Sequence, residues 1–246
     1  MPKSRKRIIE GFLKTTRERG LPERYHNVGW IVRRAPAREL RELFWTDGIC
    51  LIRLQDEEHL PEPGVYIMGQ RAGDLLEGTG SKFVGPSHWQ NAHLLATELV
   101  GREWGFKQGD TLRKIPNLAD KLHDIDRATT LGTGIRGQWE LNREQMKTIG
   151  PPAKGKKRQQ VTGELVYTSD GLFLPHSDDL HTIFKAWQPR GWMRFGTVNL
   201  KHWKSTYQML TGLMGDSLFF LSLKHGSPYM YGGFPGLGEF AYMMQL

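Results

Sequence analysis

Residues 172–181 of the chain, LFLPHSDDLH, place two histidines and two aspartates within six positions, directly after an apolar run. Alternate residues of a strand point to the same face, so His176 and Asp178 could address one metal ion. A second imidazole could come from His225, at the end of the apolar stretch GDSLFFLSLKHGSP. Two histidines and one carboxylate hold iron(II) with positions left open for substrate and oxygen. The pattern therefore predicts an iron site at His176, Asp178 and His225.

An HxD pair after a strand, followed by a GD-apolar-FF strand that ends in a distal histidine, resembles the double-stranded β-helix oxygenases. The resemblance covers residues 164–246 and implies iron(II) with 2-oxoglutarate as cofactors. The chain departs from the family after His225, where no basic residue follows to pair with the far carboxylate of 2-oxoglutarate. In an alternative interpretation, Asp178 and Asp179 cap a helix over DLHTIFKAW and leave His176 in a turn.

A second set of residues could hydrolyse a phosphodiester. The segments PGVYIMG and KFVGPS resemble the two strands that name the GIY-YIG nucleases, over residues 62–145. Matched to that family, Tyr66 would assist the attack, and Glu98 or Glu140 would hold a divalent metal ion such as magnesium. His93 stands where the family has an arginine. The alternative is that Tyr66 is a half-buried tyrosine of an ordinary strand.

Charge is unevenly distributed along the chain. Residues 161–246 hold six basic and six acidic side chains, so the net charge of +8 resides entirely in residues 1–160. Localised positive charge displaces counterions from a phosphate backbone and is typical of nucleic-acid binding. The clusters that we predict to contact DNA or RNA are Arg5, Lys6 and Arg7, then Arg33 and Arg34, and finally Lys154, Lys156, Lys157 and Arg158. A solvated surface is the alternative.

Aromatic side chains alternate with cations between residues 185 and 207. Aromatic faces beside cations can stack on unpaired bases, which predicts that Trp192 and Trp203 contact nucleic acid. Packing into the core of a sheet would explain the same residues without a ligand.

The elements that must position these residues differ between the two halves. Hydrophobic periodicity predicts helices over residues 4–19, 35–45, 87–100, 117–126 and 141–149, with two strands at residues 49–54 and 64–68. After residue 160, segments rich in β-branched and aromatic residues predict mostly sheet. We therefore expect an α+β fold with a helical, basic N-terminal half and an antiparallel, barrel-like C-terminal sheet. Its regions would be residues 1–150, a basic loop at 151–160, and residues 161–246, unless all form one domain.

The whole chain excludes some functions. Cys50 is the single cysteine, which rules out an intramolecular disulfide and a cysteine-based zinc site. No apolar run reaches the length of a membrane span, so we expect a cytoplasmic protein without a membrane partner. The sequence predicts a nucleic-acid-binding protein, with the iron oxygenase as the first enzymatic hypothesis. The alternatives are a magnesium-dependent nuclease that uses Tyr66 and a non-catalytic binding or structural protein. The sequence does not indicate an oligomeric state.

Overall fold

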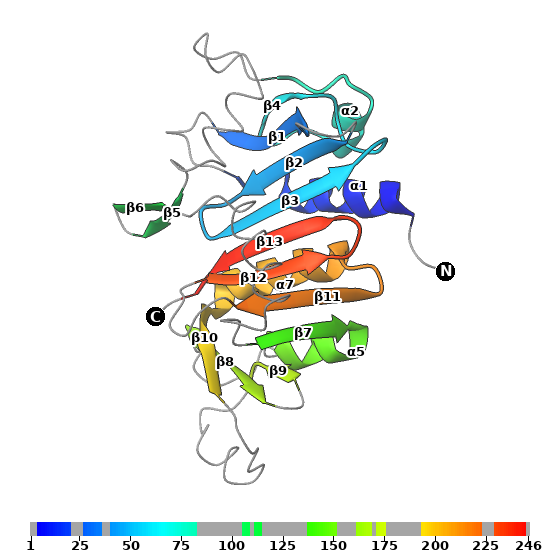
Figure 1. Cartoon of the computed structure of the whole chain (residues 1–246). Helices are drawn as coiled ribbons and strands as arrows, with labels where there is room; N and C mark the ends of the chain where they lie inside the picture. The colour runs from blue at the N-terminus through cyan, green and yellow to red at the C-terminus, as the bar shows by residue number, and fades with distance from the viewer. Residues whose placement is uncertain are drawn as a thin grey trace, which may run out of the picture.

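An eight-stranded antiparallel sheet forms the centre of the computed structural model (Figure 1). The structure describes residues 4–20, 27–35, 40–82, 105–108, 111–114, 137–151, 161–168, 171–175, 193–222 and 229–244. The helices are α1 (Arg5–Thr16), α2 (Ala72–Leu76), α5 (Arg143–Met146), the 3-10 helix η3 (Lys147–Ile149) and α7 (Leu200–Leu213). The strands are β1 (Val28–Arg34), β2 (Arg41–Thr46), β3 (Cys50–Asp56), β4 (Gly64–Ile67), β5 (Gly105–Gln108), β6 (Thr111–Lys114), β7 (Gly137–Asn142), β8 (Thr162–Thr168), β9 (Gly171–Phe173), β10 (Met193–Asn199), β11 (Ser217–Ser222), β12 (Tyr229–Phe234) and β13 (Gly238–Met243).

The large sheet consists of two similar halves. Its order is β4-β1-β2-β3-β13-β12-β11-β7. In each half a long helix, α1 or α7, precedes a meander of three strands, and one further strand flanks the outer side of that meander. The halves join where β3 pairs with β13, in a register that runs from Leu54 opposite Gly238 to Cys50 opposite Tyr242. Strands from both sides of residues 151–160 therefore share one sheet.

Both long helices cover the same face of this sheet. On α1 the residues Ile9, Phe12, Leu13 and Thr16 are buried, at the three- and four-residue spacing of one helix face. The indole N–H of Trp30 on β1 donates to the Thr16 hydroxyl over 2.9 Å. On the other half, the ring of Trp203 from α7 lies 5.2 Å from that of Tyr242 on β13. The alternation of strand residues puts Trp30 and Tyr242 on one face of the sheet.

The two helices run in opposite directions. The N-terminal residue of α1, Arg5, contacts Asp56 at the end of β3, so α1 runs antiparallel to β3. Near the N-terminus of α7, Trp203 contacts Tyr242 near the end of β13, so α7 runs antiparallel to β13. Since β3 and β13 are antiparallel, α1 and α7 are antiparallel as well, and they pack against each other. The N-termini of α1 and α7 consequently lie at opposite ends of this helix pair.

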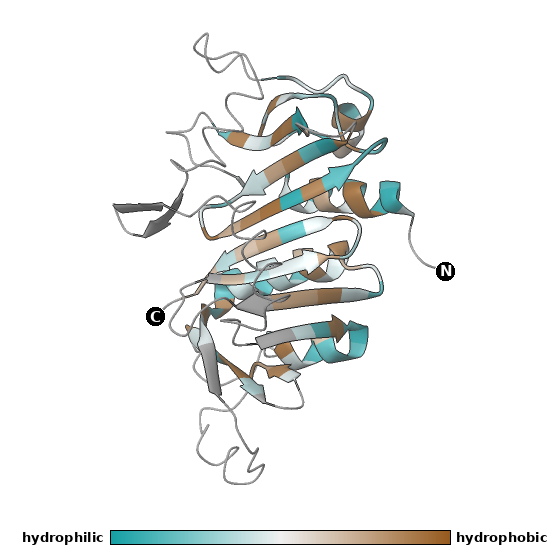
Figure 2. Cartoon of the chain, viewed as in Figure 1, coloured by the Kyte–Doolittle hydropathy of each residue, from teal (hydrophilic) through white to brown (hydrophobic). Residues whose placement is uncertain are grey.

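Two smaller sheets complete the described structure. Strands β10, β8 and β9 form one, and β5 with β6 forms the other. Within the large sheet, β3 is hydrophobic through its first half and hydrophilic toward its end, where it meets the N-terminus of α1 (Figure 2).

The predicted fold class is wrong in its N-terminal half, because residues 28–67 form four strands. Among the described residues of this half, only the short segments α1, α2, α5 and η3 are helical, and the helices expected over residues 87–100 and 117–126 lie outside the described residues. The helix expected over residues 35–45 is also wrong, since Arg41–Thr46 form strand β2. Leu40, Leu43 and Phe44 imitate a helical spacing, but Leu43 and Trp45 alternate with Glu42 and Phe44 in the paired strand. Tertiary pairing has overridden local propensity. In the C-terminal half, α7 stands where sheet was expected, and the described strands form an open sheet with β4 and β7 at its edges.

Candidate nucleic-acid interface

The exposed face of α1 is basic. Arg5, Lys6 and Arg7 form its first turn and Lys14 lies in its last, and all four side chains are exposed. No acidic residue occupies the first turn, where the partial positive charge of a helix normally favours one. Lys14 is paired with Glu10 at 2.8 Å, an exposed contact of small energy that leaves the lysine free to exchange partners.

The exposed face of α7 has the same character. Asn199 caps the helix by accepting hydrogen bonds from the backbone N–H groups of Lys201 and His202. The exposed side chains that follow are Lys201, Lys204, Gln208 and Gly212. The helix contains no acidic residue at all. Its cations, like those of α1, are concentrated near the N-terminus.

Together α1 and α7 form a basic surface, which we call the helix layer. The two helices carry six basic side chains and a single acidic one. Among the described residues, no carboxylate forms a direct ion pair with Lys6, Arg7, Lys201 or Lys204, although the pKa of Glu10 is lowered mainly by Lys14 and further by the charges of Lys6 and Arg7. Lys201 and Lys204 belong to the cations that alternate with aromatic residues in the sequence, but α7 was not predicted, so their place on a helix beside α1 was missed. The signal was present: Asn199 is a typical cap, and the buried residues Trp203, Thr206, Met209, Leu210 and Leu213 repeat at helical spacing.

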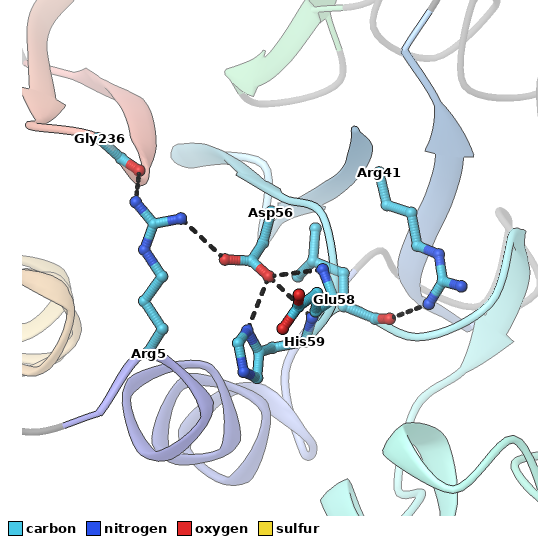
Figure 3. A network of polar contacts seen from close by, with 7 residues as sticks. Arg5, Arg41, Asp56, Glu58, His59 and Gly236 are labelled. Atoms are coloured by element: carbon cyan, nitrogen blue, oxygen red, sulfur yellow. Dashed lines mark hydrogen bonds and ion pairs between the residues drawn. The ribbon is translucent and has the colours of Figure 1, made fainter. Parts of the chain in front are cut away.

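Arg5 is bound differently from its neighbours (Figure 3). One nitrogen, Nη1, donates to Oδ2 of Asp56 over 3.1 Å, and the other, Nη2, donates to the carbonyl of Gly236 over 2.6 Å. Gly236 lies in the turn between β12 and β13. Arg5 therefore ties α1 to both halves of the sheet, while about half of its side chain remains exposed.

Asp56 is the centre of this contact network (Figure 3). Its Oδ1 accepts hydrogen bonds from the backbone N–H groups of Glu58 and His59, and lies 2.9 Å from Nδ1 of His59. Burial raises the pKa of Asp56, but the hydrogen bonds from His59, Glu58 and Arg5 outweigh it and lower the pKa from 3.8. The carboxylate thus stays charged and holds the N-terminus of α1 against the sheet.

The opposite face of the sheet holds paired charges. Nε of Arg33 donates to Oε2 of Glu42 over 2.8 Å, and the Arg33 guanidinium lies over the ring of Phe44. Nε of Arg53 lies 2.7 Å from Oε1 of Glu239. Arg33, which we predicted to contact nucleic acid, is thus mostly buried in an ion pair, whereas Arg34 is exposed at the end of β1.

Tyr66 lies in the core rather than at an accessible site. It is 1% exposed, and its hydroxyl donates to the carbonyl of Glu62 over 2.6 Å. Burial, together with the nearby charge of Glu62, raises the pKa of Tyr66 to about 12. A tyrosine that assists a nucleophile requires the opposite shift. The structure therefore assigns Tyr66 a packing contact on β4, the alternative that the sequence had left open.

Trp203 is fully buried, and its indole N–H donates to the carbonyl of Ile149 over 2.8 Å. In this arrangement its ring packs on Tyr242 and has no face free for a base. Packing into the core, rather than stacking on a base, therefore explains Trp203.

Several predicted site residues lie outside the described part of the chain. They are Glu98, Lys154, Lys156, Lys157, Arg158, Trp192 and the three iron ligands His176, Asp178 and His225. Within the described residues, no group of three or more His, Cys, Asp or Glu side chains could hold a metal ion. The iron and magnesium hypotheses remain predictions from the sequence. In the same part of the chain, no helix has the length and apolar character needed to cross a membrane.

No family model matches the chain, and no curated protein matches it. The solved structures that resemble it include the Helicobacter pylori β clamp bound to a DNA ligase peptide, at 9% identity and a TM-score of 0.44 over 97% of this chain. DNA polymerase III subunit β from Borrelia burgdorferi, in complex with a natural product, gives 8% identity and a TM-score of 0.44 over 100% of the chain. The sliding clamp from Bartonella birtlesii bound to griselimycin gives 12% identity and a TM-score of 0.44 over 98%.

These three structures are sliding clamps and neither oxygenases nor GIY-YIG nucleases. The chain spans 63%, 64% and 63% of their respective lengths. A likeness at this TM-score and identity assigns the chain neither a family nor a function.

Proposed function

We propose that the protein binds nucleic acid through contacts between the helix layer and the phosphate backbone. The observation that carries the proposal is the set of four cations, Lys6, Arg7, Lys201 and Lys204, which stand exposed on two adjacent helices without a described carboxylate partner. A polyanion supplies the missing negative charge. Each lysine or arginine that meets a phosphate releases counterions, and this release drives association.

The position of these cations supports a binding role over a structural one. Lys6, Arg7 and Lys201 lie in the first turns of their helices, where the partial positive charge of the helix opposes them. Each such placement costs about 0.3–1 kcal/mol of stability, which a solvated surface would have no reason to keep. The paired arginines on the opposite face show how this chain neutralises cations that have a structural task.

The test compares two variants of equal charge. In the first, Lys6, Arg7, Lys201 and Lys204 are changed to glutamine; in the second, Arg71, Lys82, Arg143 and Lys147, all exposed outside the helix layer, are changed instead. Fluorescence anisotropy with labelled DNA and RNA, over a series of salt concentrations, measures the affinity. The first variant should bind at least about tenfold more weakly than the wild type, with a shallower salt dependence, because counterion release scales with the phosphate contacts made.

The second variant should retain most of the affinity. If both variants lose affinity equally, the helix layer has no special role. If the wild type fails to bind DNA or RNA at low salt, the proposed function itself is wrong.

A further inference from the structure

The unpaired cations of the helix layer form two separate groups. We call Lys6 and Arg7 the α1 end, and Lys201 and Lys204 the α7 end. Because the helices are antiparallel and each group lies near an N-terminus, the groups lie at opposite ends of the layer. Helices of 12 and 14 residues, at about 1.5 Å per residue, are roughly 18 and 21 Å long, so the two ends are on the order of 15–20 Å apart.

The surface between the two ends is open to a long ligand. Its exposed residues include Gly11, Thr15, Gln208 and Gly212, which are small or uncharged. A methyl group added at Gly11 or at Gly212 would meet no atom within 4 Å. The one carboxylate of the layer, Glu10, is held by Lys14. Neither bulk nor unpaired negative charge therefore separates the α1 end from the α7 end.

We propose that one nucleic-acid molecule bridges both ends, so that tight binding requires a minimum length. Successive phosphates on one strand of a duplex rise about 3.4 Å, so a span of 15–20 Å corresponds to about four to six of them. A shorter oligonucleotide occupies one end at a time. A longer one occupies the second end at a high effective concentration, because it is already bound to the first. This inference rests on the proposed function and adds that the surface selects nucleic acids long enough to reach both ends.

The test combines oligonucleotide length with removal of one end. DNA hairpins with stems of about 3, 6, 12 and 18 base pairs are titrated into the wild type, into Lys6→Gln/Arg7→Gln, and into Lys201→Gln/Lys204→Gln. Lys147→Gln combined with Arg143→Gln is the matched control, since it removes two exposed cations outside the layer. Thermal unfolding of every variant confirms that it is folded before its affinity is compared.

For the wild type, affinity should rise steeply once the stem exceeds about six base pairs, by at least about ten times more than the increase in length alone would give. Either single-end variant should lose this rise. With the shortest oligonucleotide, removing one end should cost only about twofold, because the other end still binds; with the longest, the same change should cost at least about tenfold. The control should behave as the wild type does.

A single-end variant that loses the same factor at every length would overturn bridging, and so would one that keeps the rise with length. In both cases the wild type would still bind nucleic acid, and the proposed function would stand. Absence of binding at all lengths would instead remove the proposed function, and this inference with it.

Discussion

Arg53 and Glu239 form an ion pair across the junction of the two halves, with Nε of Arg53 2.7 Å from Oε1 of Glu239. The two residues are directly opposite each other on β3 and β13, and both side chains are mostly buried. Removing one partner of such a pair leaves the other charge without compensation in a poorly solvated place.

We expect Glu239→Gln to lower the free energy of unfolding by about 1–3 kcal/mol, measured by urea denaturation. Glu144→Gln breaks an exposed pair with Lys147 and should change this free energy by no more than about 0.5 kcal/mol. Equal effects of the two substitutions would show that the junction does not depend on its charges.

Gly232 on β12 leaves no room for a side chain. A Cβ atom there would lie 2.2 Å from Cε1 of Phe240 and 2.5 Å from the carbonyl oxygen of Phe219. Gly232→Ala should therefore destabilise the fold by about 1–3 kcal/mol through overpacking. Gly11→Ala, in the open middle of α1, should instead stabilise it by about 0.5–1 kcal/mol. Thermal unfolding of both variants checks the opposite signs, and a neutral Gly232→Ala would contradict the packing described for this strand.

The cations at the α1 end should oppose stability while they support binding. Because Lys6 and Arg7 lie in the first turn of α1, changing either one to glutamate places a favourable charge at the helix N-terminus. Each substitution should raise the free energy of unfolding by up to about 0.5 kcal/mol, since repulsion from Glu10 offsets part of the gain, and it should weaken nucleic-acid binding at the same time. Denaturation and anisotropy on the same preparations measure both effects. A loss of stability together with a loss of binding would instead indicate that these residues hold the fold.

Asp56 gives the stability a defined pH dependence. Because its pKa is lowered from 3.8 in the folded protein, it stabilises the fold above the pKa of the unfolded chain, and this contribution is lost as the pH falls through the folded pKa. Asp56→Asn should cost about 1–3 kcal/mol at neutral pH, with a difference from the wild type that shrinks below about pH 4. Urea denaturation across this range is the measurement. Glu57→Gln, at the exposed neighbour, should leave the pH profile parallel to that of the wild type.

The spacing of apolar residues along the sequence correctly predicted those helices and strands whose buried residues repeat at the same spacing. The amphipathic spacing of Ile9, Phe12 and Leu13 predicts a helix, and residues 5–16 form one. The strands predicted over residues 49–54 and 64–68 are likewise confirmed, as β3 (Cys50–Asp56) and β4 (Gly64–Ile67). Residues 41–46 were misassigned because a short apolar segment fits both periods, and only its pairing with β1 and β3 decides between them.

The candidate site was predictable only in part. Charge clustering pointed to Lys6 and Arg7, and both are exposed on α1. The clustering could not reveal that Lys201 and Lys204, almost 200 residues further on, lie on a helix packed beside them. The role of Arg5 in holding Asp56 and Gly236 likewise depends on contacts between residues distant in sequence, which no local pattern encodes.

The most direct test of the helix layer is a lysine footprint. The full chain is acetylated with and without a saturating long DNA, and mass spectrometry compares the modification of individual lysines. We expect DNA to protect Lys6, Lys201 and Lys204, while Lys147, whose side chain is 69% exposed outside the layer, stays reactive. Bound DNA that leaves Lys6, Lys201 and Lys204 as reactive as in the free protein would contradict this expectation.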